Sequence, residues 1–407
     1  MNDSITVKYL NELVSISKGK KPRNTSLENL GSGYLPYILI KSFNRNYREF
    51  TNDKSCTRVV SDDIEIVWDG ERAGLVSMGH DGYLGSTLAA ISIISESLNS
   101  NFLFYFLQSK QAYLRYLAEG TGVPHISRWS IENLEIPLLP IEKQKKIASI
   151  ITSVDEVIEN TQRQIDKLQD LKKATMNELL TKGIGHTEFK DSELGRIPKS
   201  WEVLFLYKTK NENDRYSFTG GPFGSNLKNC DFTKNGVRII QLQNIGDGSF
   251  LNKYKIYTSS QKADELISCN IYPGDIILSK MGDPVARATI IPDIETRYIM
   301  SSDGIRLSIN KKKYDLKFIL ESINHHSTRN QAKVLSVGST RQRIGLTDIR
   351  KLLIRVPQLD EQKKISSVIN SIDLKIKKIN QKLVKTKLLK KSLMQELLTG
   401  KVRVSVN

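Results

Sequence analysis

The sequence predicts a mixed α/β protein that contains two copies of one unit, each a globular part followed by a long helix. The main observation is an internal repeat. Gln144–Ile147 reads Gln-Lys-Lys-Ile and returns at 362–365, and segments 142–181 and 360–399 share 18 identical residues at one ungapped offset of 218. Apolar residues in both segments recur at steps of four and three, which is the seam of a coiled coil. Short apolar runs of strand length precede each segment.

The globular parts, 1–140 and 184–356, are predicted to have matching strands and one helix each. The expected strands are Tyr37–Ile40, Ile64–Trp68 and Leu88–Ile94 in the first part, and Val237–Ile240, Asp275–Leu278 and Gly304–Ile309 in the second. The expected helices are Asn101–Leu117 and Asp315 to about Lys333, the second containing the adjacent pair His325-His326. Each part ends in a polar loop, 120–130 or 338–345, and a last strand that leads into the long helix.

The helical parts are 141–183 and 357–407. Pro140 and Pro357 precede them, and Gly183 and Gly400 stand where a C-terminal cap belongs. Each helix of about 40 residues is roughly 60 Å long. The two helices most simply pair with each other as a spacer. A two-fold axis across them makes the pair antiparallel, and a parallel pair is the alternative.

Composition limits the classes of function. The chain has 407 residues and 39% hydrophobic residues, enough for two or three domains with buried cores. No apolar run is as long as a membrane span, the first residues do not resemble a secretory signal, and three distant cysteines fit a reducing cytoplasm. The net charge of +17 favours a polyanionic partner, nucleic acid first. A lysine-rich solubilising surface is the alternative.

Motifs for catalysis are missing from the sequence. It has no phosphate-binding glycine loop, no HExxH and no GxSxG. A methyltransferase tetrapeptide of the Asn/Asp-Pro-Pro-aromatic type is also missing. Glu188–Lys190 matches only the end of a nuclease motif, and the five histidines have no ligand spacing. The sequence therefore predicts a binding protein without catalytic residues, metal or cofactor of its own.

Side chains that suit base edges and phosphates occur in loops at matched positions of the two globular parts. Arginine and lysine suit guanine, asparagine and glutamine suit adenine, and glycine lets the backbone approach a ligand closely. For any single loop a solvated turn is an equal alternative to a DNA contact. The predicted DNA-binding residues are Lys18, Lys20, Lys21, Arg23, Asn44, Arg45, His125, Arg128, Gly220, Gly221, Gln241, Gln243, Asn244, Arg341, Gln342 and Arg343.

Three local stretches add to this organisation: the helix entries 142–147 and 360–365, the helix endings Met-x-Glu-Leu-Leu-Thr, and the linker 189–203 with its Ile-Pro-x-x-Trp-Glu-Val. Together with the order unit–helix–unit–helix, they make the whole chain resemble the specificity (S) subunit of Type I restriction-modification enzymes. The first part lacks the Ile-Pro-x-x-Trp-Glu-Val entry.

The resemblance implies that each globular part is a target recognition domain that reads one half of a bipartite, asymmetric site in double-stranded DNA. It implies that the helices set the gap and dock two modification (methyltransferase) subunits, and that restriction subunits join the complex. S-adenosylmethionine, ATP and Mg²⁺ would then belong to the partner subunits, and this chain would catalyse nothing. The alternative function is a coiled-coil adaptor that joins two protein-binding domains.

The positive charge is unevenly distributed. The net charge is −1 for 1–140, +1 for 141–183, +9 for 184–356 and +8 for 357–407. The sequence therefore predicts two unequal contacts with one duplex, of which the second is much more electrostatic than the first.

Overall fold

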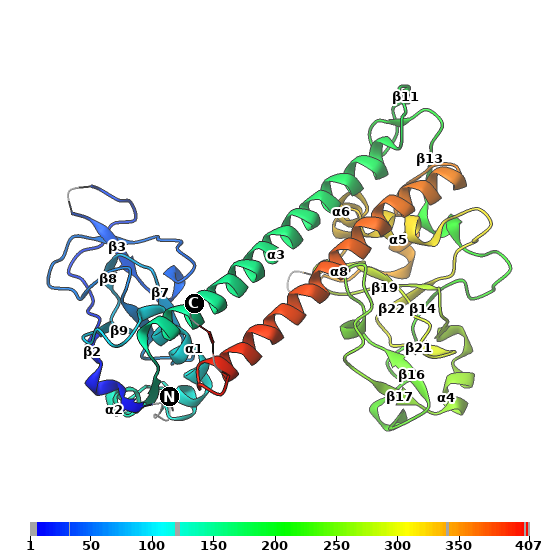
Figure 1. Ribbon diagram of the computed structural model, residues 1–407. Helices are drawn as coiled ribbons and strands as arrows, with labels where there is room; N and C mark the ends of the chain where they lie inside the picture. Colours follow the sequence, from blue (N-terminus) through cyan, green and yellow to red (C-terminus); the bar gives the residue numbers. More distant parts are fainter. Residues whose placement is uncertain (1–5, 32, 119–122, 339–341, 403, 406–407) are drawn as a thin grey trace. The chain divides into compact units, whose positions relative to one another are not determined.

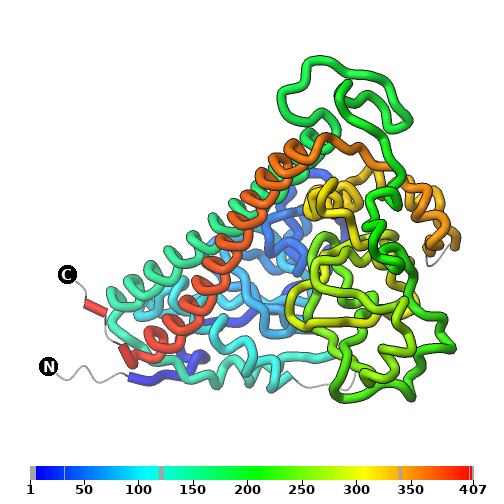
Figure 2. The backbone as a smooth tube through the Cα atoms, turned by 90° about the vertical axis from the view of Figure 1, so that its right-hand side faces the viewer, coloured from blue at the N-terminus to red at the C-terminus, as the bar shows by residue number. Residues whose placement is uncertain are grey.

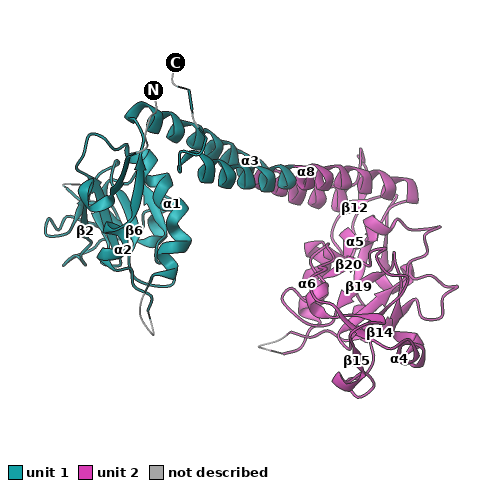
Figure 3. Ribbon diagram, turned by 60° about the horizontal axis from the view of Figure 1, so that its bottom comes forward, with its two compact units in different colours: residues 1–164, 379–407 teal, residues 165–378 magenta. Residues whose placement is uncertain are grey.

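The computed structural model describes residues 6–405 except 32, 119–122, 339–341 and 403. It divides into two compact units (Figure 3). Unit 1 comprises 1–164 and 379–407, and unit 2 comprises 165–378. Each unit contains one globular part together with one half of each long helix. No helix in the described part of the chain is long and apolar enough to cross a membrane.

The globular part of unit 1 contains two four-stranded sheets and one two-stranded sheet (Figure 1). The first sheet is antiparallel, in the order β2–β9–β6–β7. The second has the order β4–β3–β8–β5, and its strands β3 and β8 run parallel. The strands are Thr6–Tyr9 (β1, paired with β10), Val14–Lys18 (β2), Leu35–Ile38 (β3), Phe50–Thr51 (β4), Arg58–Val59 (β5), Ile64–Val67 (β6), Val76–Met78 (β7), Gly82–Leu84 (β8), Leu88–Ile93 (β9) and Glu135–Leu138 (β10).

The globular part of unit 2 repeats this plan. Its two larger sheets have the orders β14–β22–β19–β20 and β15–β17–β16–β21–β18, and β16 and β21 are again parallel. The strands are Phe189–Lys190 (β11, paired with β12), Ile197–Pro198 (β12), Glu202–Phe205 (β13, paired with β23), Phe218–Gly220 (β14), Phe232–Thr233 (β15), Val237–Ile240 (β16), Ile256–Thr258 (β17), Asn270–Ile271 (β18), Ile276–Ser279 (β19), Ala288–Ile290 (β20), Tyr298–Met300 (β21), Gly304–Leu307 (β22) and Leu353–Val356 (β23). All six strands predicted from the sequence are confirmed to within two residues.

The shorter helices cover these sheets. The first, α1, begins after Asn99, whose side chain accepts a hydrogen bond from the backbone N–H of Phe102 at 3.0 Å. It packs Phe102 and Phe106 into the core of unit 1. The short helices are Ser100–Tyr116 (α1), Arg128–Glu132 (α2), Ser260–Glu265 (α4), Leu316–Asn324 (α5), His326–Val334 (α6) and Leu346–Ile349 (α7).

The prediction of one helix from Asp315 to Lys333 is wrong, because the chain breaks at His325 into α5 and α6. His325 has an extended backbone (φ −65°, ψ 144°), and its ring accepts a hydrogen bond from the Ser327 N–H. The histidine pair therefore lies at a helix junction. The predicted loop 120–130 is also too long, since α2 begins at Arg128.

The long helices are Ile141–Lys182 (α3) and Leu359–Leu397 (α8). In unit 1, Lys390 Nζ on α8 lies 2.7 Å from Asp155 Oδ2 on α3. In unit 2, Lys172 Nζ on α3 lies 2.6 Å from Asp373 Oδ1 on α8. The two ion pairs are related by the repeat offset with the helices exchanged. The helix segments in each unit run in opposite directions (Figure 2), which confirms the antiparallel arrangement.

Each long helix has the buried glutamine of the repeated Gln-Lys-Lys-Ile in its first turn. Gln144 Oε1 accepts from the Asn99 N–H at 2.9 Å, and its Nε2 donates to the Ser97 and Leu139 carbonyls at 2.8 and 2.7 Å. Gln362 does the same with the Asp315 N–H (2.9 Å) and the Pro357 carbonyl (2.8 Å). The repeated glutamine thus joins the start of the long helix to the cap of the domain helix.

The linker after α3 is held against the start of α8 within unit 2. Trp201 is fully buried, and its Nε1 donates to Glu361 Oε2 at 3.0 Å. The other oxygen of Glu361 accepts from the Ile184 N–H and contacts His186 Nε2 at 2.8 Å. A single carboxylate therefore fixes the linker that the sequence singled out.

One acidic residue is buried in the first sheet of unit 1. Glu65 on β6 is fully buried, and neither carboxylate oxygen has a hydrogen-bond partner. Burial raises its pKa to about 8. The matching position in unit 2 is Ile277, which packs in an apolar cluster. Unit 1 therefore contains a titratable group where unit 2 has ordinary core.

Candidate nucleic-acid interface

Three polar side chains meet at the end of β2 in the first domain. Asp69, just after β6, accepts from Lys18 Nζ at 3.0 Å, and its other oxygen contacts His125 Nδ1. Burial raises the pKa of Asp69, but the hydrogen bonds from His125 and Lys18 outweigh it and hold that pKa below its ordinary value. Lys18 and His125 remain about half exposed. One carboxylate, that of Asp69, therefore holds a lysine ammonium group and an imidazole ring at the surface of the domain.

The polar loop of the second domain occupies the same place in the fold. In the first domain the backbone of His125 forms an isolated antiparallel β-bridge with that of Asp69. In the second domain the backbone of Arg343 forms the same kind of β-bridge with that of Met281. The following residues, Ile126 and Ile344, are buried and donate to carbonyls at the ends of β6 and β19. Arg343 is therefore the counterpart of His125, as the matching of the two loops in the sequence indicated.

The second domain has a stronger cationic group at this position. Arg343 Nη2 lies 2.9 Å from Asp303 Oδ1 and is half exposed. Lys280 Nζ donates to the Ser302 carbonyl at 2.9 Å. Burial, and then the nearby Arg343 guanidinium, lower the pKa of Lys280. Gln342 is held here through its carbonyl, which accepts from the Gly282 N–H at 3.3 Å. Arg341 lies outside the described residues.

The glycines near this site are explained first by packing. A Cβ on Gly221 would lie 1.8 Å from the Ser301 carbonyl oxygen, and one on Gly19, the matching residue in the first domain, 2.1 Å from the Gly85 carbonyl oxygen. Only glycine lets these strand ends cross the neighbouring chain. A Cβ on Gly220 would instead meet the flexible end of Lys280 at 2.8 Å. The close approach at Gly221 is therefore to the protein's own backbone.

A second loop of the first domain carries Asn44 and Arg45, both exposed. Arg45 has φ +62°, and its guanidinium lies against Gly79, where a Cβ would be 2.8 Å from Nη2. The loop is anchored by Tyr47, whose hydroxyl is 2.8 Å from Nδ1 of the buried His80. The structure therefore presents Asn44 and Arg45 from a fixed turn.

The corresponding loop of the second domain contradicts one prediction. Asn244 is buried, its Nδ2 donates to the carbonyls of Leu251 and Tyr254, and its Oδ1 accepts from the Gln241 N–H. Its side chain folds the loop, so its interpretation as a base-reading residue is wrong. Gln243 is exposed beside it, and Gln241 is half-buried.

The remaining basic residues of the first domain are separate from the Asp69 group. Lys20, Lys21 and Arg23 are exposed on the loop after β2. The Arg23 N–H and Ser55 donate to Asp53 and lower its pKa to about 2. Arg128 lies on α2, where its Nε is 2.7 Å from Glu132 and its Nη2 donates to the Ile16 carbonyl. Arg128 is therefore engaged within the domain.

Sequence reasoning missed Asp69 and Asp303, which pair with the predicted residues Lys18, His125 and Arg343, and Lys280, which lies near Arg343. Each follows or precedes a strand, but the pairing between distant strands brings it to the site, and no spacing in the sequence indicates that. In the described ranges no group of three His, Cys, Asp or Glu side chains is placed to hold a metal.

Comparison with known proteins shows which family the chain is similar to. A model of the family described as Type I restriction modification DNA specificity domain matches residues 2–170 and 205–387. The Type I restriction enzyme MjaVIII specificity subunit of Methanocaldococcus jannaschii is 30% identical over 404 residues, which cover 97% of this chain and 92% of that protein. The EcoBI specificity subunit of Escherichia coli is 18% identical over 84% of this chain and 74% of its own length.

Solved structures show the same fold. The S subunit of the Type I restriction-modification system from M. genitalium is 15% identical and aligns with a TM-score of 0.57 over 100% of this chain and 98% of its own. A chain from a study of complex assembly and conformational transition of the type I R-M system is 16% identical and aligns with a TM-score of 0.61 over 98% of both chains.

Proposed function

Since the chain belongs to the family of Type I restriction-modification specificity subunits, we propose that His125 in the first domain and Arg343 in the second read different halves of one bipartite DNA target. The observation that carries this proposal is their equivalence. Each residue lies at the equivalent β-bridge of its own domain, and the side chains around the two residues differ. Arginine suits a guanine edge, whereas the imidazole–carboxylate group of His125 and Asp69 offers another donor and acceptor pattern.

The chain is the non-catalytic DNA-recognition subunit of its complex. We propose further that two modification subunits dock on the long helices and that restriction subunits join them. S-adenosylmethionine, ATP and Mg²⁺ then belong to these partners. The free cysteines Cys56, Cys230 and Cys269 support the proposed reducing cytoplasm.

Methylation mapping tests the assignment of half-sites. The complete complex with its modification subunits is produced with His125→Ala or Arg343→Ala, and the methylated motif is read from host DNA. Each variant is expected to relax a different half of the motif and to leave the gap unchanged. Loss of one bidentate base contact weakens specific binding by about 1–3 kcal/mol. Lys234→Ala, at an exposed position outside the long helices, serves as the control.

Three outcomes contradict the proposal. If both variants change the same half-site, the pseudo-symmetric assignment is wrong. If neither changes the motif and both only reduce affinity uniformly, these residues contact phosphates. A complex that shows no salt-dependent DNA binding at all favours the coiled-coil adaptor instead.

A further inference from the structure

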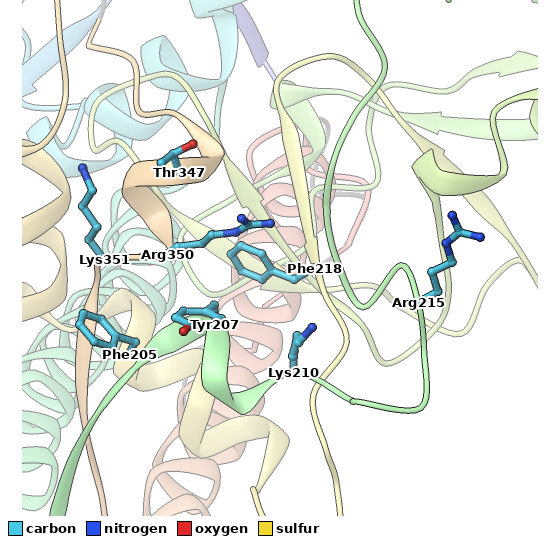
Figure 4. A pocket seen from close by; sticks show the side chains of 8 residues that line it. All are labelled: Phe205, Tyr207, Lys210, Arg215, Phe218, Thr347, Arg350 and Lys351. Carbon is cyan, nitrogen blue, oxygen red and sulfur yellow. The ribbon is translucent and has the colours of Figure 1, made fainter.

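The second recognition domain has a cavity of about 610 Å³, and none of the predicted DNA-binding residues lines it (Figure 4). Three aromatic side chains, Phe205, Tyr207 and Phe218, form walls, and they come from β13, the turn after it and β14. Four cations and one threonine complete the lining, and none of the lining residues is acidic. The volume lies in the range of small-ligand sites.

The cations in this cavity are largely uncompensated. Lys351 Nζ is 2.8 Å from Asp348. Lys210, Arg215 and Arg350 have no ion-pair partner among the residues that the structure describes. Arg350 lies over the Phe218 ring at 5.9 Å, a cation–π contact that leaves its charge unneutralised. Like charges held together around one cavity favour a bound anion.

The aromatic walls add a surface for stacking. Phe205 is 45% exposed, and its ring lies 6.1 Å from that of Tyr207 with an interplanar angle of 33°. In Figure 4 these two rings and Phe218 lie near one another, whereas Arg215 stands at the far side of the cavity. Aromatic rings with cations spread around them are typical of sites that bind nucleotides in a strand.

The first domain has no such cation at the matching place. The repeat offset and the strand pairing place Glu132 where the second domain has Arg350, and Asn133 where it has Lys351. Glu132 is itself paired with Arg128 at 2.7 Å. The cavity therefore accounts for part of the excess charge of the second domain, and it is not a general feature of the scaffold.

We propose that this cavity binds one unstacked nucleotide of the bound DNA, with the base against Phe205 and Tyr207 and the phosphates on Lys210, Arg215 and Arg350. Stacking against aromatic rings accepts any base, so the cavity contributes affinity and salt dependence without changing the recognised sequence. The inference rests on the proposed function. The shared chemistry, a base with phosphates, also belongs to a free mononucleotide, and the spread of cations across the cavity favours the strand.

Photo-crosslinking tests the proposal directly. The complete complex is bound to duplexes that contain its methylated motif, with 5-iodouracil placed singly across the site and its flanks. At least one position is expected to crosslink to Phe205 or Tyr207, as read by mass spectrometry of the peptide 202–210. The crosslink should disappear in Phe205→Leu. An excess of free dAMP or ATP should not compete it away.

Affinity measurements form the second arm. Arg350→Glu, which copies the charge of the first domain at an exposed position, is expected to weaken DNA binding at least tenfold and to flatten its salt dependence. Lys234→Glu makes the same charge change at an exposed position outside the cavity and is expected to weaken binding less than threefold. The methylated motif should stay the same in both.

The outcomes distinguish the cavity proposal from the proposed function. If the complex binds its motif but no position crosslinks to this segment, and Arg350→Glu behaves like Lys234→Glu, the cavity proposal is overturned and the proposed function stands. Competition by free nucleotide with unchanged DNA affinity also overturns it, in favour of a mononucleotide site. Failure of the complex to bind any DNA contradicts the proposed function itself.

Discussion

Replacing Gln144 with leucine tests how the first recognition domain is fixed to its long helix. The side chain is fully buried and makes three hydrogen bonds, with the Asn99 N–H and with the Ser97 and Leu139 carbonyls, all at 2.7–2.9 Å. Leucine has a similar volume but no polar atom. The change therefore leaves these three backbone groups without their hydrogen-bond partner, while the core stays filled.

The expected cost follows from these contacts. A buried backbone group that loses its partner costs about 1–3 kcal/mol. Taking the low end for each of the three groups, and crediting about 1 kcal/mol for the added apolar burial, gives a net loss of about 2 kcal/mol. Gln362→Leu is the matched control in the other unit. Its third bond, to the Lys313 carbonyl, is long at 3.5 Å, so its expected loss is about 1–2 kcal/mol.

Hydrogen exchange of the full chain measures both variants. In Gln144→Leu the protected amides of α1 should exchange about 30 times faster, because 1.4 kcal/mol corresponds to tenfold. Those of α5 should not change. In Gln362→Leu the pattern should reverse, with a smaller effect. Equal loosening of α1 and α5 by either variant, or no change in α1, would refute the reasoning that each glutamine anchors its own domain.

Three further predictions concern single sites. Because burial raises the pKa of Glu65 from 4.5 to about 8, the folded state keeps the proton, and the free energy of unfolding should fall by up to about 5 kcal/mol as pH rises from 4.5 to 8. Glu65→Gln should remove this pH dependence when unfolding is measured at several pH values. An unchanged pH dependence would mean that another group causes it. Asp155→Lys and Lys390→Asp should each lower the free energy of unfolding, measured by urea denaturation, by about 1–3 kcal/mol. The double variant, in which the two charges are exchanged, should recover part of this loss. If the double variant is no more stable than the less stable single variant, the ion pair does not hold the helices together in unit 1. Gly221→Ala should destabilise the second domain by about 2 kcal/mol or more, because the new Cβ at position 221 would meet backbone atoms. Gly220→Ala should destabilise it much less, because its Cβ meets only the end of a lysine side chain. Equal melting temperatures for the two variants would contradict this.

The sequence predicted the parts of the site more reliably than their roles. The matched loops that contain His125 and Arg343 were found from the repeat, and the structure puts the two residues at equivalent β-bridges of their own domains. Asn244 was misread because an exposed and a buried asparagine look alike in a sequence. The carboxylate of Asp69 was missed because strand pairing, and no short spacing, brings it to Lys18.

The sequence by itself determined the repeat, the two long helices and the family, because periodicity and identity at a fixed offset are properties of the chain alone. It also determined that the excess positive charge lies after the first helix. Only the tertiary structure decided which cations are free. Arg343 and Arg350 are equally charged in the sequence, but folding pairs the first with Asp303 and leaves the second over an aromatic ring at a cavity. The physical reason is that a charge acts through its neighbours in space, and these are chosen by packing between residues far apart in the chain.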